Sequence, residues 1–221
     1  MRSRLYHYLG ANYALQDLQL RRLKIATFQD LNDPFELIAA DNSDRKQRQF
    51  LRGWKEDIQS KWGVLCFSRT WRNPVLWSHY ADKHKGMCLG FDISNELLLP
   101  IKYSQSRISV DLVTLQNSGG ITQKFMLRLM GTKFSGWSYE NEVRVSSELK
   151  ERDPDTGLLF VQFSDDLILR KVIAGPLCDV RETEIRDALG ADHSHIKPKK
   201  ARLAFQKFNV VENKKGSGSL Q

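Results

Sequence analysis

The sequence has little cysteine and no long apolar segment, and both shortages restrict what the protein can be. It contains 3 cysteines in 221 residues, and their wide spacing matches neither a disulfide framework nor a set of zinc ligands. No apolar run approaches the roughly 20 residues that a membrane-spanning helix needs, and the N-terminus has no signal-peptide pattern. These features predict a cytoplasmic protein with reduced thiols and no membrane partner.

Several common catalytic motifs are also missing. The sequence has no Walker-type phosphate loop and no dinucleotide-binding glycine fingerprint. It has no nucleophile elbow around a serine and no local Cys–His signature. His79 and His84 are five residues apart, which places them on different sides of a helix, and no Cys or carboxylate cluster completes a site. We therefore expect no metal cofactor.

Positive charge is in excess. The formal net charge is +8 and the isoelectric point is near 9.4, which favours acidic partners such as nucleic acid or phosphorylated cofactors. The densest basic segment runs from Lys197 to Lys207. Its side chains Lys199, Lys200 and Arg202 are candidates for binding a nucleic-acid backbone. The alternative is a solvated strand face near the end of the chain.

The order of apolar segments and helix signals predicts an α+β fold. Alternating or continuous apolar runs indicate strands at 4–10, 23–28, 64–70 and 87–93, and helix signals bound the segments 45–63 and 73–86. We expect a single domain over residues 1–211, with a mixed, mainly antiparallel sheet and flanking helices. Residues 212–221 are expected to form a flexible or expression-derived tail.

The segment "WSYENEVRVS", from Trp137 to Ser146, has two glutamates two residues apart. Side chains at this spacing share one face of a strand, so Glu140, Glu142 and Arg144 are predicted to point the same way. One interpretation is a solvated face with a Glu–Arg pair. The other is a catalytic carboxylate.

Two further segments offer ligand-binding side chains. The loop "LNDPFE" contains Asn32 and is either a structural turn or one wall of a ligand cleft. In the helix "WSHYADKHKG", Trp77 is expected in the core, whereas His79 and Tyr80 have hydrogen-bonding and stacking groups suited to a ring-shaped ligand.

Taken together, the motifs "LNDPFE", "LWSHYADKHKGMCLGFD" and "YENEVRV" resemble those of a widespread bacterial family catalogued as a domain of unknown function. The resemblance covers most of residues 5–189. It implies a small cytoplasmic protein, and some members of the family are encoded near phage-defence genes.

The same motifs resemble ADP-ribosyltransferases more distantly. That superfamily has an Arg or His on the first strand, a Ser or Tyr on or after a middle strand, and a Glu on a later strand. The matching residues here are His7, Ser68, Tyr80 and Glu142, with Glu140 completing a Glu-x-Glu motif. The resemblance implies an ADP-ribosyltransferase-like fold and NAD as a substrate.

It also implies roles for these residues. Glu142 would stabilise the positive charge that builds on the ribose when the nicotinamide bond breaks, and Glu140 would orient or deprotonate the acceptor. His7 would bind the adenosine ribose, Tyr80 would stack on the nicotinamide, and Ser68 would support Glu142. The protein would then be an effector in phage defence or a toxin.

Two alternatives remain open. One is a nucleic-acid-binding protein or nuclease of a bacterial defence system, and the other is a non-catalytic module that senses a nucleotide. The transferase hypothesis requires His7, Tyr80 and Glu142 to line one pocket.

Overall fold

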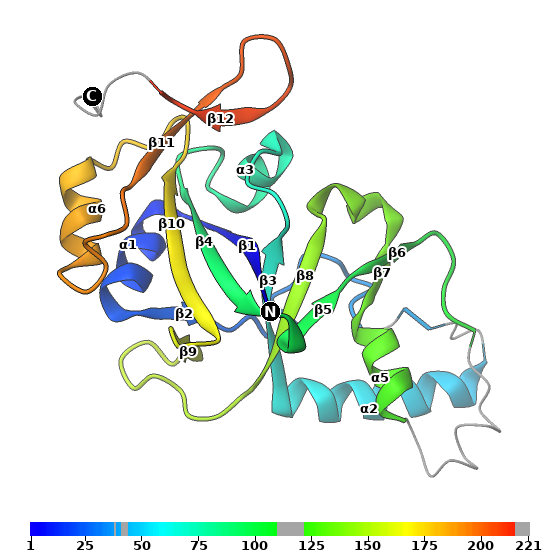
Figure 1. The fold of residues 1–221 in the computed structure, drawn as a ribbon. Coiled ribbons are helices and arrows are strands. Elements are labelled where there is room, and N and C mark those ends of the chain that lie inside the picture. The colour runs from blue at the N-terminus through cyan, green and yellow to red at the C-terminus, as the bar shows by residue number, and fades with distance from the viewer. Residues whose placement is uncertain (38, 41–43, 110–121, 215–221) are drawn as a thin grey trace.

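The centre of the molecule is a curled eight-stranded sheet, seen in a computed structural model that describes residues 1–37, 39–40, 44–109 and 122–214 (Figure 1). Its strands are β1 (Arg2–Leu9), β3 (Trp62–Ser68), β4 (Met87–Ser94), β5 (Leu98–Pro100), β8 (Glu142–Glu148), β10 (Leu167–Ala174), β11 (Lys199–Leu203) and β12 (Val210–Glu212). They lie in the order β12-β11-β10-β4-β1-β3-β8-β5. Only the β10–β11 pair among these neighbours is parallel, within the part of the chain that the structure describes. The predicted mixed, mainly antiparallel sheet with flanking helices is confirmed.

Helices cover both faces of this sheet. On one face α1 (Ala11–Leu20) and α6 (Glu182–Leu189) pack against apolar side chains of β1, β4 and β10. On the other face α3 (Pro74–Tyr80) places Trp77 against Tyr6 and Cys88. Strand β4 is therefore buried from both sides over residues 87–91, as its run of apolar residues predicts.

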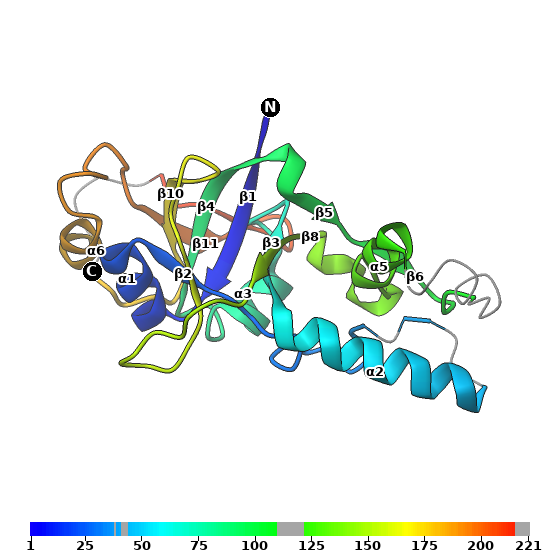
Figure 2. The ribbon, with the colours of Figure 1, turned by 90° about the horizontal axis from the view of Figure 1, so that it is seen from below.

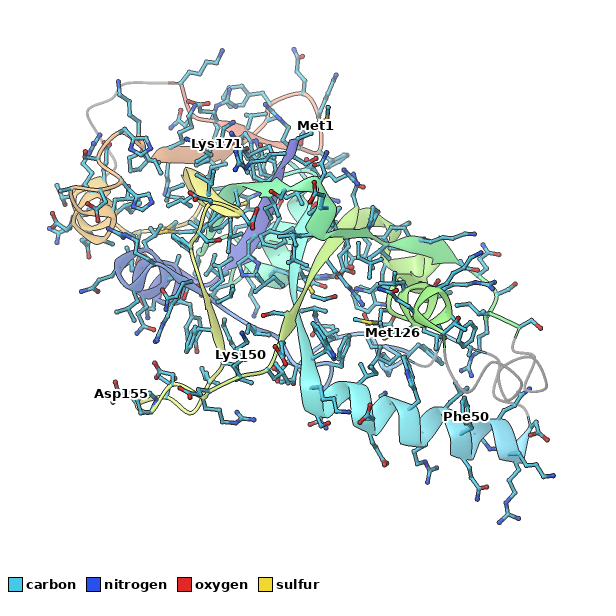
Figure 3. The ribbon with its side chains drawn as sticks, turned by 60° about the horizontal axis from the view of Figure 1, so that its bottom comes forward. Met1, Phe50, Met126, Lys150, Asp155 and Lys171 are labelled. Carbon is cyan, nitrogen blue, oxygen red and sulfur yellow. The ribbon has the colours of Figure 1, made fainter. Side chains whose placement is uncertain are left out.

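A second group of elements extends from the β5 edge of the sheet. It contains α2 (Arg45–Lys61), α5 (Gln123–Met130), and the parallel pair β6 (Lys102–Ser104) and β7 (Thr132–Phe134). A small core that includes Leu51, Ile108 and Leu129 joins α2 to α5. Figure 2 shows these helices at the opposite end of the molecule from α1 and α6. Figure 3 labels Phe50 and Met126 at this end and Lys171 of β10 at the other.

Several predicted elements differ from the structure. The strand expected at 23–28 is reduced to β2 (Arg22–Lys24), which pairs with β9 (Phe160–Gln162). The helix expected to reach Gly86 ends at Tyr80, and Asp82, Lys83 and His84 follow with positive φ angles. Gly86 is needed there because a Cβ atom would lie 2.2 Å from the carbonyl oxygen of Leu9.

The helix expected over 45–63 also ends early. Asp44 caps α2 by accepting from the backbone N–H of Gln47 at 2.9 Å, but Trp62 and Gly63 already belong to β3. Gly63 is not a helix stop, since a Cβ atom there would lie 2.8 Å from the carbonyl oxygen of Ala26. A glycine is needed here because the segments around Gly63 and Ala26 approach each other closely.

The Glu-x-Glu segment is not one continuous strand. Ser135–Glu140 forms the 3₁₀ helix η2, Asn141 is left-handed with φ 47°, and β8 begins at Glu142. The prediction that Glu140 and Glu142 share a strand face by simple alternation is therefore wrong. Asn141 tolerates this conformation better than most residues, and the turn brings the two carboxylates together by another route.

The end of the chain is only partly described. Glu212, predicted to belong to the tail, is the last residue of β12, whereas residues 215–221 lie outside the described part. In the middle of the chain, the short 3₁₀ helix η1 (Asn95–Leu97) connects β4 to β5. Within the described ranges no helix has the length and apolar character needed to cross a bilayer.

Candidate functional site

A cavity of about 240 Å³ opens between β1 and β3. In the described structure these two strands are paired at one register position only, Tyr6 with Ser68. The cavity is smaller than the roughly 300–1,000 Å³ of pockets that enclose a whole ligand, so it fits one ring-sized part of a larger molecule. Its walls include six of the side chains predicted from the sequence, namely His7, Asn32, Ser68, Tyr80, Glu140 and Glu142.

His7 faces this cavity as a neutral imidazole. Its Nδ1 atom lies 2.9 Å from the carbonyl oxygen of Cys66. Because a carbonyl only accepts, Nδ1 carries the proton and Nε2 keeps a lone pair. Burial lowers the pKa of His7, and the bond to Cys66 only partly offsets this. His7 thus offers a hydrogen-bond acceptor suited to a hydroxyl group.

Three carboxylates converge on the ammonium of Lys133 at the cavity wall. Lys133 Nζ lies 2.6 Å from Glu140 Oε2, 3.0 Å from Glu142 Oε2 and 3.8 Å from Glu36 Oε1. All four side chains are at most 7% exposed. No group of three His, Cys, Asp or Glu side chains arranged for a metal ion occurs in the described residues, and here the cation is the lysine.

Arg144 forms the inner layer of this cluster and is fully buried. Its Nε donates to Glu142 Oε1 at 2.7 Å, and its Nη2 donates to Glu142 Oε2 at 3.1 Å. The same guanidinium bonds both oxygens of Glu36 at 2.5 and 2.8 Å. Paired, fully hydrogen-bonded charges are the form in which ionised groups are tolerated in a protein interior. The Glu–Arg pair expected in "WSYENEVRVS" is therefore present, but the expectation that it lies on a solvated face is wrong, because Glu142 and Arg144 are buried.

The two glutamates of the motif differ in their proton affinity. Burial would raise the pKa of Glu142, but Arg144 and Lys133 outweigh it and lower that pKa to about 2. Burial raises the pKa of Glu140 above its ordinary value, and Lys133 only partly opposes the shift. Glu142 is thus the permanently ionised member, and Glu140 is the member closer to accepting a proton.

Tyr80 and Ser68 connect this pair to the neighbouring elements. The Tyr80 hydroxyl donates to Glu140 Oε1, and Ser68 Oγ donates to the backbone carbonyl of Glu140 at 2.6 Å. Burial first, and then the bond to Glu140, raises the pKa of Tyr80, so its hydroxyl keeps its proton. The resemblance had implied that Ser68 supports Glu142. In the structure Ser68 instead bonds the backbone of Glu140.

Comparisons with protein-family models, curated proteins and solved structures found no match for this chain. The geometry of the cavity and of the surfaces around it therefore carries the functional argument.

The loop "LNDPFE" serves both purposes that its sequence suggested. Asn32 lines the cavity, whereas Asp33 Oδ1 accepts from the backbone N–H of Phe35 at 2.9 Å and stabilises the turn. Glu36 points inward to Arg144. The loop thus joins the cavity to the charged cluster.

His79 does not join the predicted site. It is exposed on α3, lies outside the cavity wall, and its Nδ1 is 2.9 Å from the hydroxyl of Tyr139. The physical reason is helical geometry, since adjacent residues on a helix point about 100° apart and Tyr80 is the one that faces inward.

The three predicted nucleic-acid residues lie on β11, beyond β10 and β4 from the cavity. Lys199 Nζ is 2.7 Å from Glu212 Oε2, and Lys200 Nζ donates to the carbonyl of Cys178. Both lysines therefore already have partners. The Arg202 guanidinium lies over the ring of Phe205, 4.3 Å from its centroid.

Two residues of the site were missed by the sequence reasoning. Lys133 follows a helix in "GTKF", where nothing local distinguishes it from a surface lysine. Tyr103, whose hydroxyl accepts from the backbone N–H of Glu142 at 2.8 Å, is likewise brought in from β6 by tertiary packing alone. One signal in the sequence could have indicated a buried cation. The segments "NDPFE" and "YENE" contain several acids, and carboxylates that are buried need a cationic partner.

Proposed function

We propose that this chain is an ADP-ribosyltransferase-like protein that binds NAD at the β1–β3 cavity and cleaves the bond between nicotinamide and ribose. One observation carries the proposal. His7 comes from the first strand, and Ser68 and Tyr80 come from a middle strand and the helix after it. Glu140 and Glu142 come from η2 and from the start of β8, yet all five side chains line a single cavity. That is the residue order of the superfamily that the sequence resembles.

The binding part of the proposal follows from the donors and acceptors. His7 presents a lone pair on Nε2, which matches a ribose hydroxyl acting as a donor. The ring of Tyr80 lines the same cavity and offers a face for stacking on nicotinamide. A cavity of about 240 Å³ accommodates one part of NAD, with the remainder outside.

The bond-breaking step uses negative charge. As the ribose C1′–N bond breaks, its electron pair passes to the nicotinamide ring nitrogen and positive charge builds on the ribose. A carboxylate that stays ionised, as Glu142 does with a pKa of about 2, stabilises that charge without first losing a proton. Arg144 and Glu36 are positioning residues, because they fix Glu142 without reaching the cavity wall.

The transfer step needs a base. A hydroxyl or amine of the acceptor forms the new bond to C1′, and its proton goes to Glu140. The raised pKa of Glu140 suits this role, since a base works best when its pKa lies near the working pH. Activity is then expected to fall as pH decreases through the pKa of Glu140.

The test measures nicotinamide release from NAD and label transfer from biotinylated NAD in bacterial lysate. Glu140→Gln keeps the size of the side chain and an acceptor for Tyr80, and should lower both by about 10²–10⁴-fold. The matched control is Glu148→Gln, an exposed carboxylate at the far end of the neighbouring strand β8, which should keep full activity. Digestion of labelled products by nuclease or protease then gives the acceptor class.

Two negative results would have different meanings. If Glu140→Gln keeps full activity, the assignment of the base is wrong. If the wild-type protein neither releases nicotinamide nor gains thermal stability with NAD, the NAD site itself is wrong.

A non-catalytic nucleotide sensor is the second candidate, and one observation favours it. The carboxylate oxygens of Glu140 and Glu142 all have donors within the protein. A ligand must therefore displace or share those bonds. A sensor predicts stabilisation by NAD without nicotinamide release, so the same experiment separates the two. Under either candidate, the resemblance to the bacterial family supports a role in phage defence, and the transferase candidate is also compatible with a toxin.

A further inference from the structure

The hairpin between β11 and β12 exposes an unusual amount of aromatic surface. Figure 1 shows this loop projecting at the top of the molecule, and the N–H of Ala204 donates to the carbonyl of Asn209 at 2.9 Å across its base. Phe205 is 90% exposed and Phe208 is 100% exposed. Leu203, just before them, is 57% exposed. Single exposed apolar residues are ordinary, but neighbouring ones on a projecting tip indicate an interaction site.

The charge around the tip has one sign. Residues 197–211 contain five Lys or Arg and no Asp or Glu. Lys199 and Lys200 are engaged by Glu212 and by the Cys178 carbonyl, which leaves Arg202 and Lys207 closest in sequence to the rings. Arg202 covers one face of the Phe205 ring at 4.3 Å from the centroid. The tip thus combines open aromatic faces with positive charge.

We propose that this hairpin binds single-stranded nucleic acid, with bases stacked on Phe205 and Phe208 and phosphates bound by Arg202 and Lys207. Aromatic side chains accept any base because every base has a stacking face, and arginine adds a cation–π contribution. The site lies within the basic segment that the sequence singled out and keeps Arg202, but it leaves out Lys199 and Lys200, which already have partners. It does not depend on NAD chemistry, because the cavity lies between β1 and β3.

The same features argue against insertion of the tip into a lipid surface. Lys207 lies between the two phenylalanines in sequence, and the Arg202 guanidinium rests on the Phe205 ring. Inserting the rings into a bilayer would carry both cations toward the apolar layer, where charge is costly. On a single strand, the same cations meet phosphates. The isoelectric point near 9.4 is also typical of nucleic-acid-binding domains.

The test uses fluorescence anisotropy with a labelled oligothymidylate of about 15 nucleotides and no NAD. Phe205→Ala and Phe208→Ala should each weaken binding by about five- to 150-fold, which corresponds to one lost stacking contact. Lys207→Ala should reduce the slope of log affinity against log salt by about 0.7, the value for one phosphate contact on a single strand. The exposure of these residues means that substitution should leave thermal unfolding unchanged.

Two matched controls define the outcome. Tyr13→Ala removes another exposed aromatic ring, 68% accessible on α1, and Lys46→Ala removes an exposed cation on α2; both should bind as the wild type does. No binding at low salt, or equal losses in the control and hairpin variants, would overturn the proposal. So would binding of the wild type to vesicles of phosphatidylglycerol that is lost in Phe208→Ala while oligothymidylate binding is kept.

Discussion

Asp17 is an acid on α1 that is only 6% exposed. Burial raises its pKa to about 7, with Arg22 acting in the opposite direction. Because the folded pKa exceeds the unfolded one, the unfolded chain ionises first as pH rises. The free energy of unfolding therefore falls between about pH 4 and pH 7.

Replacing Asp17 with Asn should remove this loss of stability. We expect Asp17→Asn to be more stable than the wild type by about 2–4 kcal/mol at pH 7.5 and nearly equal to it at pH 4. Urea unfolding of both proteins at the two pH values measures this. A constant difference across the range would show that Asp17 is ionised in the folded protein.

Glu142 and Glu140 should contribute very differently to stability. Glu142→Gln weakens the charge-assisted bonds from Arg144 and Lys133 to this side chain, although Arg144 keeps Glu36 as a partner, and should cost about 3 kcal/mol. Glu140→Gln should cost about 1 kcal/mol or less, since the raised pKa of Glu140 shows that ionisation in the fold brings little gain. Thermal and urea unfolding of the two variants compare them directly. Equal costs would contradict the division between a structural and a proton-accepting carboxylate.

At the level of elements, the N-terminus of α3 determines where Tyr80 lies. Asn73 Oδ1 accepts from the backbone N–H of Val75 at 2.9 Å, and Asn73 Nδ2 donates to the carbonyl of Tyr139 at 2.9 Å. The side chain therefore caps the helix and also joins it to η2, next to Glu140. The cavity depends on this junction, because α3 and η2 carry two of its walls.

Asn73→Ala should lose both contributions and cost about 2 kcal/mol of unfolding free energy. Thr122→Ala is the matched control. Thr122 caps α5 by accepting from Phe125 N–H at 3.3 Å, and its loss should cost about 1 kcal/mol. Asn73→Asp keeps the cap acceptor but loses the donor to Tyr139. Its cost in unfolding free energy should lie between those of Asn73→Ala and Thr122→Ala. Denaturant titration of the three variants gives the order, and an Asn73→Asp cost equal to that of Asn73→Ala would show that capping is unimportant here.

At the scale of the whole molecule, the two groups of elements have unequal cores. The sheet with α1 and α6 shares one large apolar cluster, whereas α2 and α5 meet through two smaller ones, one that includes Leu51 and Leu129 and one that includes Ile58 and Met130. Local stability follows buried apolar contact. The part containing α2, α5, β6 and β7 should therefore open more easily than the sheet.

Amide hydrogen exchange tests this difference. Amides of β4 and β10 should exchange last, close to the limit set by global unfolding, and those of α2 and α5 should exchange earlier. If NAD binds as proposed, it should slow exchange in β7 and η2, since Lys133 and Glu140 lie at the cavity wall. Uniform protection across both parts would contradict the unequal cores.

Much of the fold could be predicted because its signals are local. The apolar run of β4, the Asn73–Pro74 start of α3 and the glycine after α6 act within a few residues of themselves. The boundaries that failed depend on distant contacts. Gly63 and Gly86 read as helix stops, yet each is required by the close approach of another segment.

The sequence by itself determined which residue types were available to the site: a histidine on the first strand, a tyrosine after a capped helix start, and two glutamates beside an arginine. Only the tertiary structure decided how they combine. The parting of β1 and β3 opens the cavity, Lys133 comes from β7 to meet Glu140 and Glu142, and Glu36 reaches Arg144 from the far loop. Burial then separates the pKa values of the two glutamates, because the cost of a charge depends on every group packed around it and not on its neighbours in the chain.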